Sequence, residues 1–277
     1  MKYRFMRFPG FMTKCVTMSF DDGSTHDKKL VEIMDKNGIK GTFNINGIHY
    51  GGNDPWRLTD EELRTLFLPN GHEVANHGMQ HAAPINLTNV EGMLEVIEGR
   101  RAAEKFFDCI IRGFAFPDRT ESNEDIRQYL RMSGTAYARV TQATGNFDVP
   151  QDFLAWRPTC KHTDENALQL AQRFLEAEVE KQYCARRDSL LFFVWGHSFE
   201  CPKDDFTQFT HLCETLGGHD DIWYAPCIDI CDYVSAYRSL IASVDNRLLY
   251  NPSTIRVFLE WDEKRYSVGP GETIHIR

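Results

Sequence analysis

Residues 15–23 read CVTMSFDDG, an apolar run that ends on two adjacent carboxylates. The run predicts a buried β-strand over Cys15 to Phe20, because short apolar stretches bounded by a turn are typical of parallel-sheet strands. A helical pattern follows from His26 to Asn37, and Gly41 to Ile45 (GTFNI) then predicts a second strand. This strand–helix–strand order indicates a right-handed βαβ unit and a parallel sheet.

The same alternation continues along most of the chain. Thr59 with Glu62, and Thr88 with Glu91, form capping-box patterns that predict two helix starts. Further strands are predicted at His72–Asn76, Gly113–Phe116, Tyr137–Val140, Leu190–Trp195 and Ile222–Tyr224. Six to seven such units in about 240 residues predict a TIM-like α/β barrel, one unit short of the usual eight.

The tail has a different pattern from the rest of the chain. It shows period-two stretches with turn signals at Asn251-Pro252 and Pro270-Gly271, which predict a small β extension. We therefore expect a barrel over residues 1–245 and a C-terminal β appendage over residues 246–277 that packs on it.

Bulk composition limits the class of protein. The 277 residues are 42% hydrophobic and 26% charged, which suits one large globular core. The net charge of -9 disfavours a nucleic-acid partner and suits an uncharged or cationic substrate. No apolar leader or membrane-spanning run is visible, so we expect no membrane partner and a cytoplasmic protein. The 8 cysteines are scattered, and we expect buried thiols rather than disulfides or a zinc site.

Reactive side chains follow three of the predicted strands. Asp21 and Asp22 leave the first strand, His77 and His81 follow HEVAN at i and i+4, and His197 follows the most apolar strand. Catalytic groups of a parallel barrel lie at the carboxyl ends of its strands, so these residues are expected to meet. One carboxylate and two imidazoles would share a metal, the other carboxylate would act as a base, and the last histidine as an acid. The simpler alternatives are a helix-capping loop for the aspartates and a buried structural histidine at position 197.

Two of these segments resemble motifs of a known family. SFDDG (residues 19–23) and GHEVANHGMQH (residues 71–81) resemble the first and second motifs of the polysaccharide-deacetylase superfamily, carbohydrate esterase family four. The resemblance covers roughly residues 14–240. It implies a distorted (β/α)7 barrel and a metal-dependent hydrolase that acts on the amide of an N-acetylated amino sugar.

The resemblance also implies a role for each residue. Asp21 would be the general base and His197 the general acid. Asp22, His77 and His81 would hold one divalent metal, zinc first, with cobalt, nickel and manganese also suited to two imidazoles and a carboxylate.

The weaker motifs depart from the family pattern. Residues 115–119 read AFPDR, without the arginine that usually steadies the base, and Arg119 or Arg157 is the expected replacement. Asp152 stands where the fourth motif has its orienting aspartate. The second motif has Gly78 where serine or threonine is usual.

Four further residues are predicted around the acyl group. The loop of Pro117 and Asp118 would offer a backbone N–H to the oxyanion, and Trp156 and Trp195 would wall the acyl pocket, unless they are ordinary core aromatics. The partner would be an acylated saccharide or a small amide, and the oligomeric state stays open. Two alternatives remain: hydrolysis of another linear or cyclic amide on the same fold, and a catalytically decayed carbohydrate-binding protein.

Overall fold

The computed structural model describes residues 3–118, 122–201 and 205–276, and its centre is a parallel β-sheet. The strands follow the order β6-β5-β4-β3-β2-β8-β7, and β9 joins this sheet by pairing with β2. They are β2 (Lys14–Asp21), β3 (Gly41–Ile45), β4 (Glu73–Asn76), β5 (Gly113–Ala115), β6 (Tyr137–Arg139), β7 (Cys160–Lys161), β8 (Leu190–Gly196) and β9 (Ile222–Tyr224). The sheet is parallel throughout, as the βαβ pattern predicts.

The two ends of the strand series meet between β6 and β7. Trp156 forms a parallel bridge with Arg139 of β6, and its N–H donates to Ala138 O at 2.9 Å. A few residues later β7 pairs with β8. The seven strands from β2 to β8 therefore surround a common interior, and the predicted distorted (β/α)7 barrel is confirmed.

The strand β2 lies at the centre because both of its faces are buried. Val16, Met18 and Phe20 pack in the core under the helices, whereas Cys15 packs in the barrel interior with Phe193 of β8. All 8 residues of the strand are buried. A strand covered on both faces needs apolar side chains at nearly every position, which explains the continuous run in the sequence.

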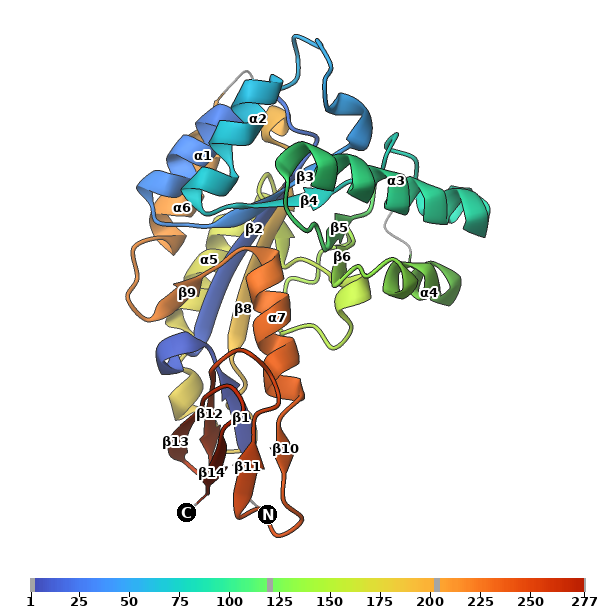
Figure 1. The fold of residues 1–277 in the computed structure, drawn as a ribbon. Coiled ribbons are helices and arrows are strands. Elements are labelled where there is room, and N and C mark those ends of the chain that lie inside the picture. The colour runs from blue at the N-terminus through green and yellow to red at the C-terminus, as the bar shows by residue number, and fades with distance from the viewer. Residues whose placement is uncertain (1–2, 119–121, 202–204, 277) are drawn as a thin grey trace.

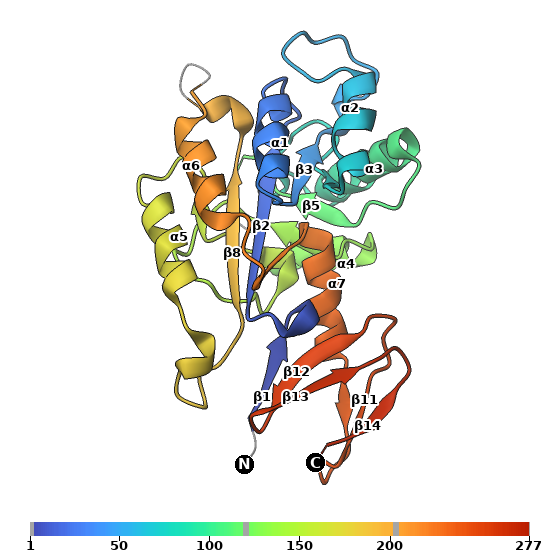
Figure 2. The same cartoon turned by 90° about the vertical axis from the view of Figure 1, so that its left-hand side faces the viewer.

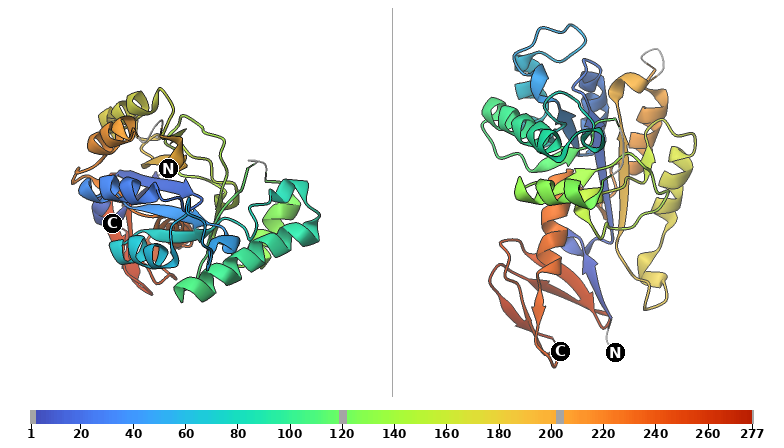
Figure 3. Two further views of the ribbon diagram at one scale, coloured as in Figure 1. Left: turned by 90° about the horizontal axis from the view of Figure 1, so that it is seen from above. Right: turned by 90° about the vertical axis from the view of Figure 1, so that its right-hand side faces the viewer.

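Helices cover the outside of the sheet (Figures 1 and 2). They are α1 (Asp27–Lys36), α2 (Asp60–Leu66), α3 (Asn89–Phe107), α4 (Glu124–Met132), α5 (Ala167–Glu176), α6 (Thr207–Leu216) and α7 (Cys227–Arg238). Both predicted capping boxes are confirmed: Thr59 is the N-cap of α2 and Thr88 is the N-cap of α3. From above, α3 and α4 lie together on one side of the sheet (Figure 3). No helix in the described part of the chain has the length and apolar character needed to cross a membrane.

Two small antiparallel sheets, in the orders β1-β12-β13 and β10-β11-β14, form the β appendage. Their strands are β1 (Arg4–Arg7), β10 (Ile241–Ala242), β11 (Leu248–Tyr250), β12 (Val257–Trp261), β13 (Lys264–Val268) and β14 (Thr273–His275). Both termini lie here, below the starts of β2 and β8 in Figure 1. The boundary at residue 245 remains a proposal, and β1 and β10 lie on its N-terminal side.

The cysteines behave as the sequence predicts. All 8 are free thiols, and most of them are buried as small apolar side chains.

Candidate metal centre

Asp21 and Asp22 point in different directions because the chain turns sharply after β2. Asp21 is the last residue of the strand, and Asp22 has a φ of 80°, a left-handed conformation that few non-glycine residues adopt. The Asp22 N–H donates to Asn44 O at 2.9 Å, which fixes the turn. Gly23 follows with a φ of 62°, and a Cβ there would lie 2.8 Å from Ile45 Cδ1. The SFDDG motif thus presents two carboxylates at one strand end with separate orientations.

His77 and His81 come from a bent loop directly after β4. Gly78 and His81 both have positive φ, of 81° and 62°. The carboxylate of Glu95, on α3, accepts the backbone N–H groups on either side of His81, at 2.6 and 3.1 Å. A Cβ at Gly78 would lie 2.7 Å from Glu95 Oε1, so this contact explains the glycine where the family usually has serine or threonine.

Asp22, His77 and His81 form a group that could hold a metal ion. One ligand atom from each lies within 4.8 Å of the others. Asp22 Oδ1 is 3.6 Å from His81 Nε2 and 3.9 Å from His77 Nε2. Among the residues that the structure describes, Asp22 Oδ1 and His77 Nε2 are buried without a hydrogen-bond partner. Buried polar atoms normally have partners, so this donor set fits a divalent cation.

The hydrogen bond of His77 Nδ1 supports the assignment of His77 Nε2 as a metal ligand. His77 Nδ1 lies 2.9 Å from Ala115 O, a contact in which the ring nitrogen must donate. This tautomer leaves the lone pair of Nε2 facing the two other candidate ligands. Burial lowers the pKa of His77, despite the nearby carboxylates of Asp21 and Asp22, and favours the neutral ring that metal binding requires.

Asp21 is paired with Arg139, a residue that the sequence reasoning missed. The Arg139 Nη2 atom lies 2.6 and 2.5 Å from the two oxygens of Asp21, and both side chains are buried. Asn44 Nδ2 donates to Asp21 Oδ1 at 2.8 Å. Burial opposes ionisation, but the Arg139 guanidinium, with His77 and His197, outweighs it and holds the pKa of Asp21 below its ordinary value. The signal in the sequence is an arginine inside an apolar strand prediction.

His197 faces both aspartates and is held from behind by Glu200. Its Nε2 lies 3.7 Å from Asp21 Oδ2 and 3.9 Å from Asp22 Oδ2. Glu200 Oε1 lies 3.1 Å from Nδ1, and Glu200 Oε2 accepts the His197 N–H at 3.1 Å. Lys161 Nζ donates to the same carboxylate at 2.6 Å. Burial lowers the pKa of His197, but Glu200 and Asp21 outweigh this effect and raise it overall.

Glu200 was also missed from the sequence. It ends the short 3-10 helix Ser198–Glu200, three residues after His197, and this spacing is the signal that could have found it. Asp152, the predicted orienting residue, lies elsewhere: it caps the 3-10 helix Phe153–Ala155 and is 3.8 Å from Arg127.

The other predicted residues are divided between the site and the core. Asp118 Oδ1 is 3.6 Å from His81 Nδ1, and Trp195 stacks under Arg139, whose Cζ is 4.9 Å from its ring centre. Trp156 is buried against Tyr137, Phe153 and Phe193 in the barrel core. Pro117 is buried beside Asp118, and Arg119 lies outside the described residues. Arg157 donates to Gln142 O, away from Asp21.

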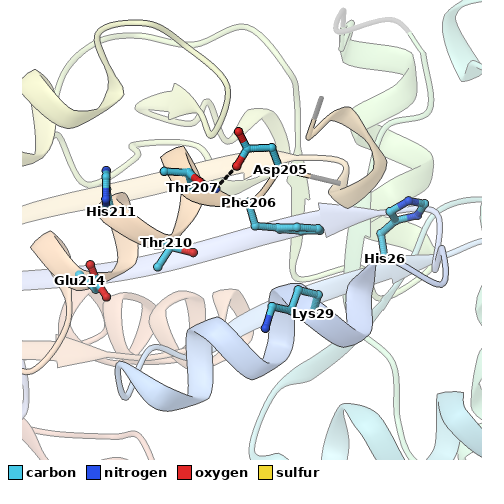
Figure 4. Close-up of a pocket in the computed structure, with 8 residues that line it drawn as sticks. All are labelled: His26, Lys29, Asp205, Phe206, Thr207, Thr210, His211 and Glu214. Carbon is cyan, nitrogen blue, oxygen red and sulfur yellow. Dashed lines mark hydrogen bonds between the residues drawn. The ribbon is translucent and has the colours of Figure 1, made fainter. Parts of the chain in front are cut away.

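A groove of about 670 Å³ lies between α1 and α6, outside the barrel mouth (Figure 4). It is lined by His26, Lys29, Asp205, Phe206, Thr207, Thr210, His211 and Glu214. None of the predicted site residues lines it.

The family model described as Polysaccharide deacetylase matches residues 10–138. The predicted resemblance to this family is confirmed. The matched segment contains Asp21, Asp22, His77 and His81, and it ends one residue before Arg139. No curated protein matches the sequence.

Solved structures of polysaccharide deacetylases and related esterases share the fold. A candidate polysaccharide deacetylase from Mycobacterium smegmatis is 17% identical, with a TM-score of 0.57 over 84% of this chain and 93% of that chain. A family 4 carbohydrate esterase from Streptomyces lividans, in complex with acetate, is 18% identical, with a TM-score of 0.51 over 76% and 92%. A family 4 acetyl xylan esterase from Clostridium thermocellum, in complex with a cobalt ion, is 17% identical, with a TM-score of 0.50 over 78% and 90%.

Proposed function

We propose that the chain is a metal-dependent deacetylase that hydrolyses the amide of an N-acetylated amino sugar. The observation that carries this proposal is the convergence of Asp22, His77 and His81 within 4.8 Å, with Asp21 and His197 beside them. Two imidazoles and a carboxylate suit zinc, and also cobalt, nickel or manganese. A divalent cation held there would supply a Lewis acid for the water and for the acyl oxygen.

The proton transfers are assigned to Asp21 and His197. Asp21 is kept ionised by Arg139, so it is able to accept the proton of the attacking water. His197 is kept protonated to a higher pH by Glu200, so it is able to donate a proton to the departing amine. A pair of groups whose surroundings push their pKa values apart is what a base and an acid in one site require.

The loop after β5 would stabilise the developing oxyanion. Pro117 has no N–H, so the backbone N–H of Asp118 is the donor that the described part of this loop offers. Asp118 has a φ of 53°, which turns the chain at this point, and its side chain is near His81. We assign Trp195, on the barrel-facing side of β8, to the wall of the acyl pocket.

Release of acetate from an N-acetylglucosamine oligosaccharide by metal-reconstituted protein tests the proposal. Asp21→Asn and His197→Ala should each lower kcat about 10² to 10⁴-fold while metal is retained. Turnover of a cyclic amide instead of the saccharide would favour the other hydrolase class. Saccharide binding without any acetate release would favour a decayed binding protein.

A further inference from the structure

The segment of Trp56 and Arg57 is fixed beside the candidate metal ligand Asp22. Arg57 forms an antiparallel bridge with Ser24, in the turn that follows β2. Two backbone hydrogen bonds flank the bridge, from Thr25 N to Trp56 O at 3.1 Å and from Leu58 N to Gly23 O at 3.0 Å. The turn that presents Asp22 therefore also fixes where the Arg57 guanidinium lies.

Arg57 is a largely buried cation whose ion-pair partner, Asp22, lies at long range. Its side chain is 18% exposed, and its Nη1 donates to the backbone oxygen of Asp22. Its Nε is buried and has no hydrogen-bond partner among the residues that the structure describes. The Asp22 Oδ1 atom is 3.8 Å away, beyond hydrogen-bond distance, and Asp54 is exposed, where water screens its charge. A guanidinium in this position is costly unless an anion reaches it.

Metal binding would leave the positive charge of Arg57 with still less neutralisation. Asp22 Oδ1 is also the oxygen nearest to His77 and His81, so a cation held there would take its negative charge. The other cations of the site already have partners, since Arg139 is paired with Asp21 and Lys161 with Glu200. Arg57 is then a cation beside the metal centre that has lost its partner, Asp22.

An aromatic surface connects Arg57 with the proposed general acid. The Arg57 guanidinium carbon lies 4.5 Å from the centre of the Trp56 ring, and Trp56 is 38% exposed. Trp56 packs on Phe199 at 4.8 Å between ring centres, and Phe199 packs on His197 at 5.0 Å. An apolar surface next to a guanidinium suits a sugar ring that carries a carboxylate, which arginine binds through two parallel hydrogen bonds.

We propose that Arg57, with Trp56 beside it, is a subsite for a carboxylate carried by the acylated saccharide. This inference rests on the proposed deacetylase function and narrows its substrate class. The net charge of -9 predicted an uncharged or cationic substrate, whereas this subsite would bind an anionic one. The positive charge of Arg57 beside the metal ligands outweighs the net charge of the chain at short range.

Matched acid and ester substrates test the subsite. One pair is a disaccharide of N-acetylglucosamine and a uronic acid, and its methyl ester; the other is N-acetylglucosamine with an O-linked lactyl group, and its methyl ester. Metal-reconstituted wild-type protein should bind and hydrolyse at least one acid about 10 to 100-fold better than its ester. Arg57→Gln should abolish that preference.

Arg64→Gln is the matched control, because Arg64 also stacks on an aromatic ring and donates to a backbone oxygen, at Phe106. It should keep the acid preference. Calorimetric binding is measured beside acetate release, so that the subsite is tested even if no amide is cleaved. Equal affinity of the wild-type protein for acid and ester in both pairs, or a preference that survives in Arg57→Gln, would overturn the subsite proposal. Arg57-dependent binding of an acid without acetate release would support the subsite and count against the deacetylase function.

Discussion

At the scale of single residues, the site depends on two charged partners, one that favours the ionised form of Asp21 and one that favours the protonated form of His197. Arg139 contacts both oxygens of Asp21, and Glu200 contacts both the ring and the backbone of His197. Each contact joins a residue at a strand end to a partner with opposite charge. The pKa of Asp21 falls and that of His197 rises as a result.

Arg139→Gln tests the pairing with Asp21. Loss of the guanidinium should raise the pKa of Asp21, so the acid limb of the kcat profile should move to higher pH. Breaking a buried ion pair should also lower the free energy of unfolding by about 3 kcal/mol. Arg157→Gln is the control, because Arg157 is exposed and, among the residues that the structure describes, donates to a backbone oxygen of the neighbouring loop and not to Asp21. An acid limb unchanged in Arg139→Gln would contradict the assignment of Asp21 as the base.

Asp27 predicts a pH dependence of stability. It is buried at the start of α1, and burial, with Asp22 and Asp21 adding to it, raises its pKa to about 8 against the hydrogen bond from Ser198. The folded chain therefore holds a proton that the unfolded chain releases near pH 4. The contribution of Asp27 to the free energy of unfolding is therefore fully present below about pH 4, and it is lost as the pH rises from there toward and through about 8.

Urea unfolding of chelator-treated protein at pH 5 and pH 8.5 measures this effect. The wild-type protein should lose more stability between the two values than Asp27→Asn, which has no proton to release. Asp245→Asn, at an exposed loop position, should lose as much as the wild-type protein. Equal losses in the wild-type protein and Asp27→Asn would show that Asp27 is ionised in the fold.

At the scale of secondary structure elements, α3 supports the loop that carries the histidines. Glu95 accepts two N–H groups of this loop, and Asn76 Nδ2 donates to Val96 O at 2.9 Å. A Cβ at Gly99 would lie 2.4 Å from Asn76 Oδ1 and 2.5 Å from the carbonyl carbon of Gly78, so the helix packs directly against the backbone that follows His77. The positions of the two imidazoles are therefore set by the packing of a helix.

Glu95→Ala should weaken metal binding without removing a ligand. The two loop N–H groups would lose their acceptor, and loss of such supporting contacts typically costs about 10 to 100-fold in metal affinity. Zinc affinity from a competition titration measures the change. Glu98→Ala, at a half-buried position on the same helix that pairs with Arg101 and not with the loop, is the control. Unchanged affinity in Glu95→Ala would show that the loop holds its shape alone.

Elements and strand ends were predictable because their signals are local. The apolar run before Asp21, the capping box at Thr59 and the i, i+4 spacing of His77 and His81 each occupy a few neighbouring residues. Arg139 was missed because its contact with Asp21 spans 118 residues and depends on how the barrel closes. The pairing of β1 with β12 was missed for the same reason, since no local pattern joins residues 4–7 to the tail.

At the scale of the whole molecule, the barrel brings strand ends from distant segments to one rim. Asp21 ends β2 and Asp22 follows it, His77 follows β4, and His197 follows β8, yet these side chains lie within 4 Å of one another in pairs. The β appendage lies at the opposite end, below the starts of the strands in Figure 1. The proposed chemistry therefore belongs to the rim of the barrel, and its central claim is a metal held by Asp22, His77 and His81.

The metal content of the purified chain after incubation with zinc and removal of free metal tests this claim most directly. We expect about one divalent ion per chain in the wild-type protein and in Asp21→Asn, and little in His77→Ala and Asp22→Asn. His211→Ala, at an exposed position on α6, should keep the full content. A wild-type chain that binds no metal, or a His77→Ala chain that keeps its full content, would contradict the assignment of this site.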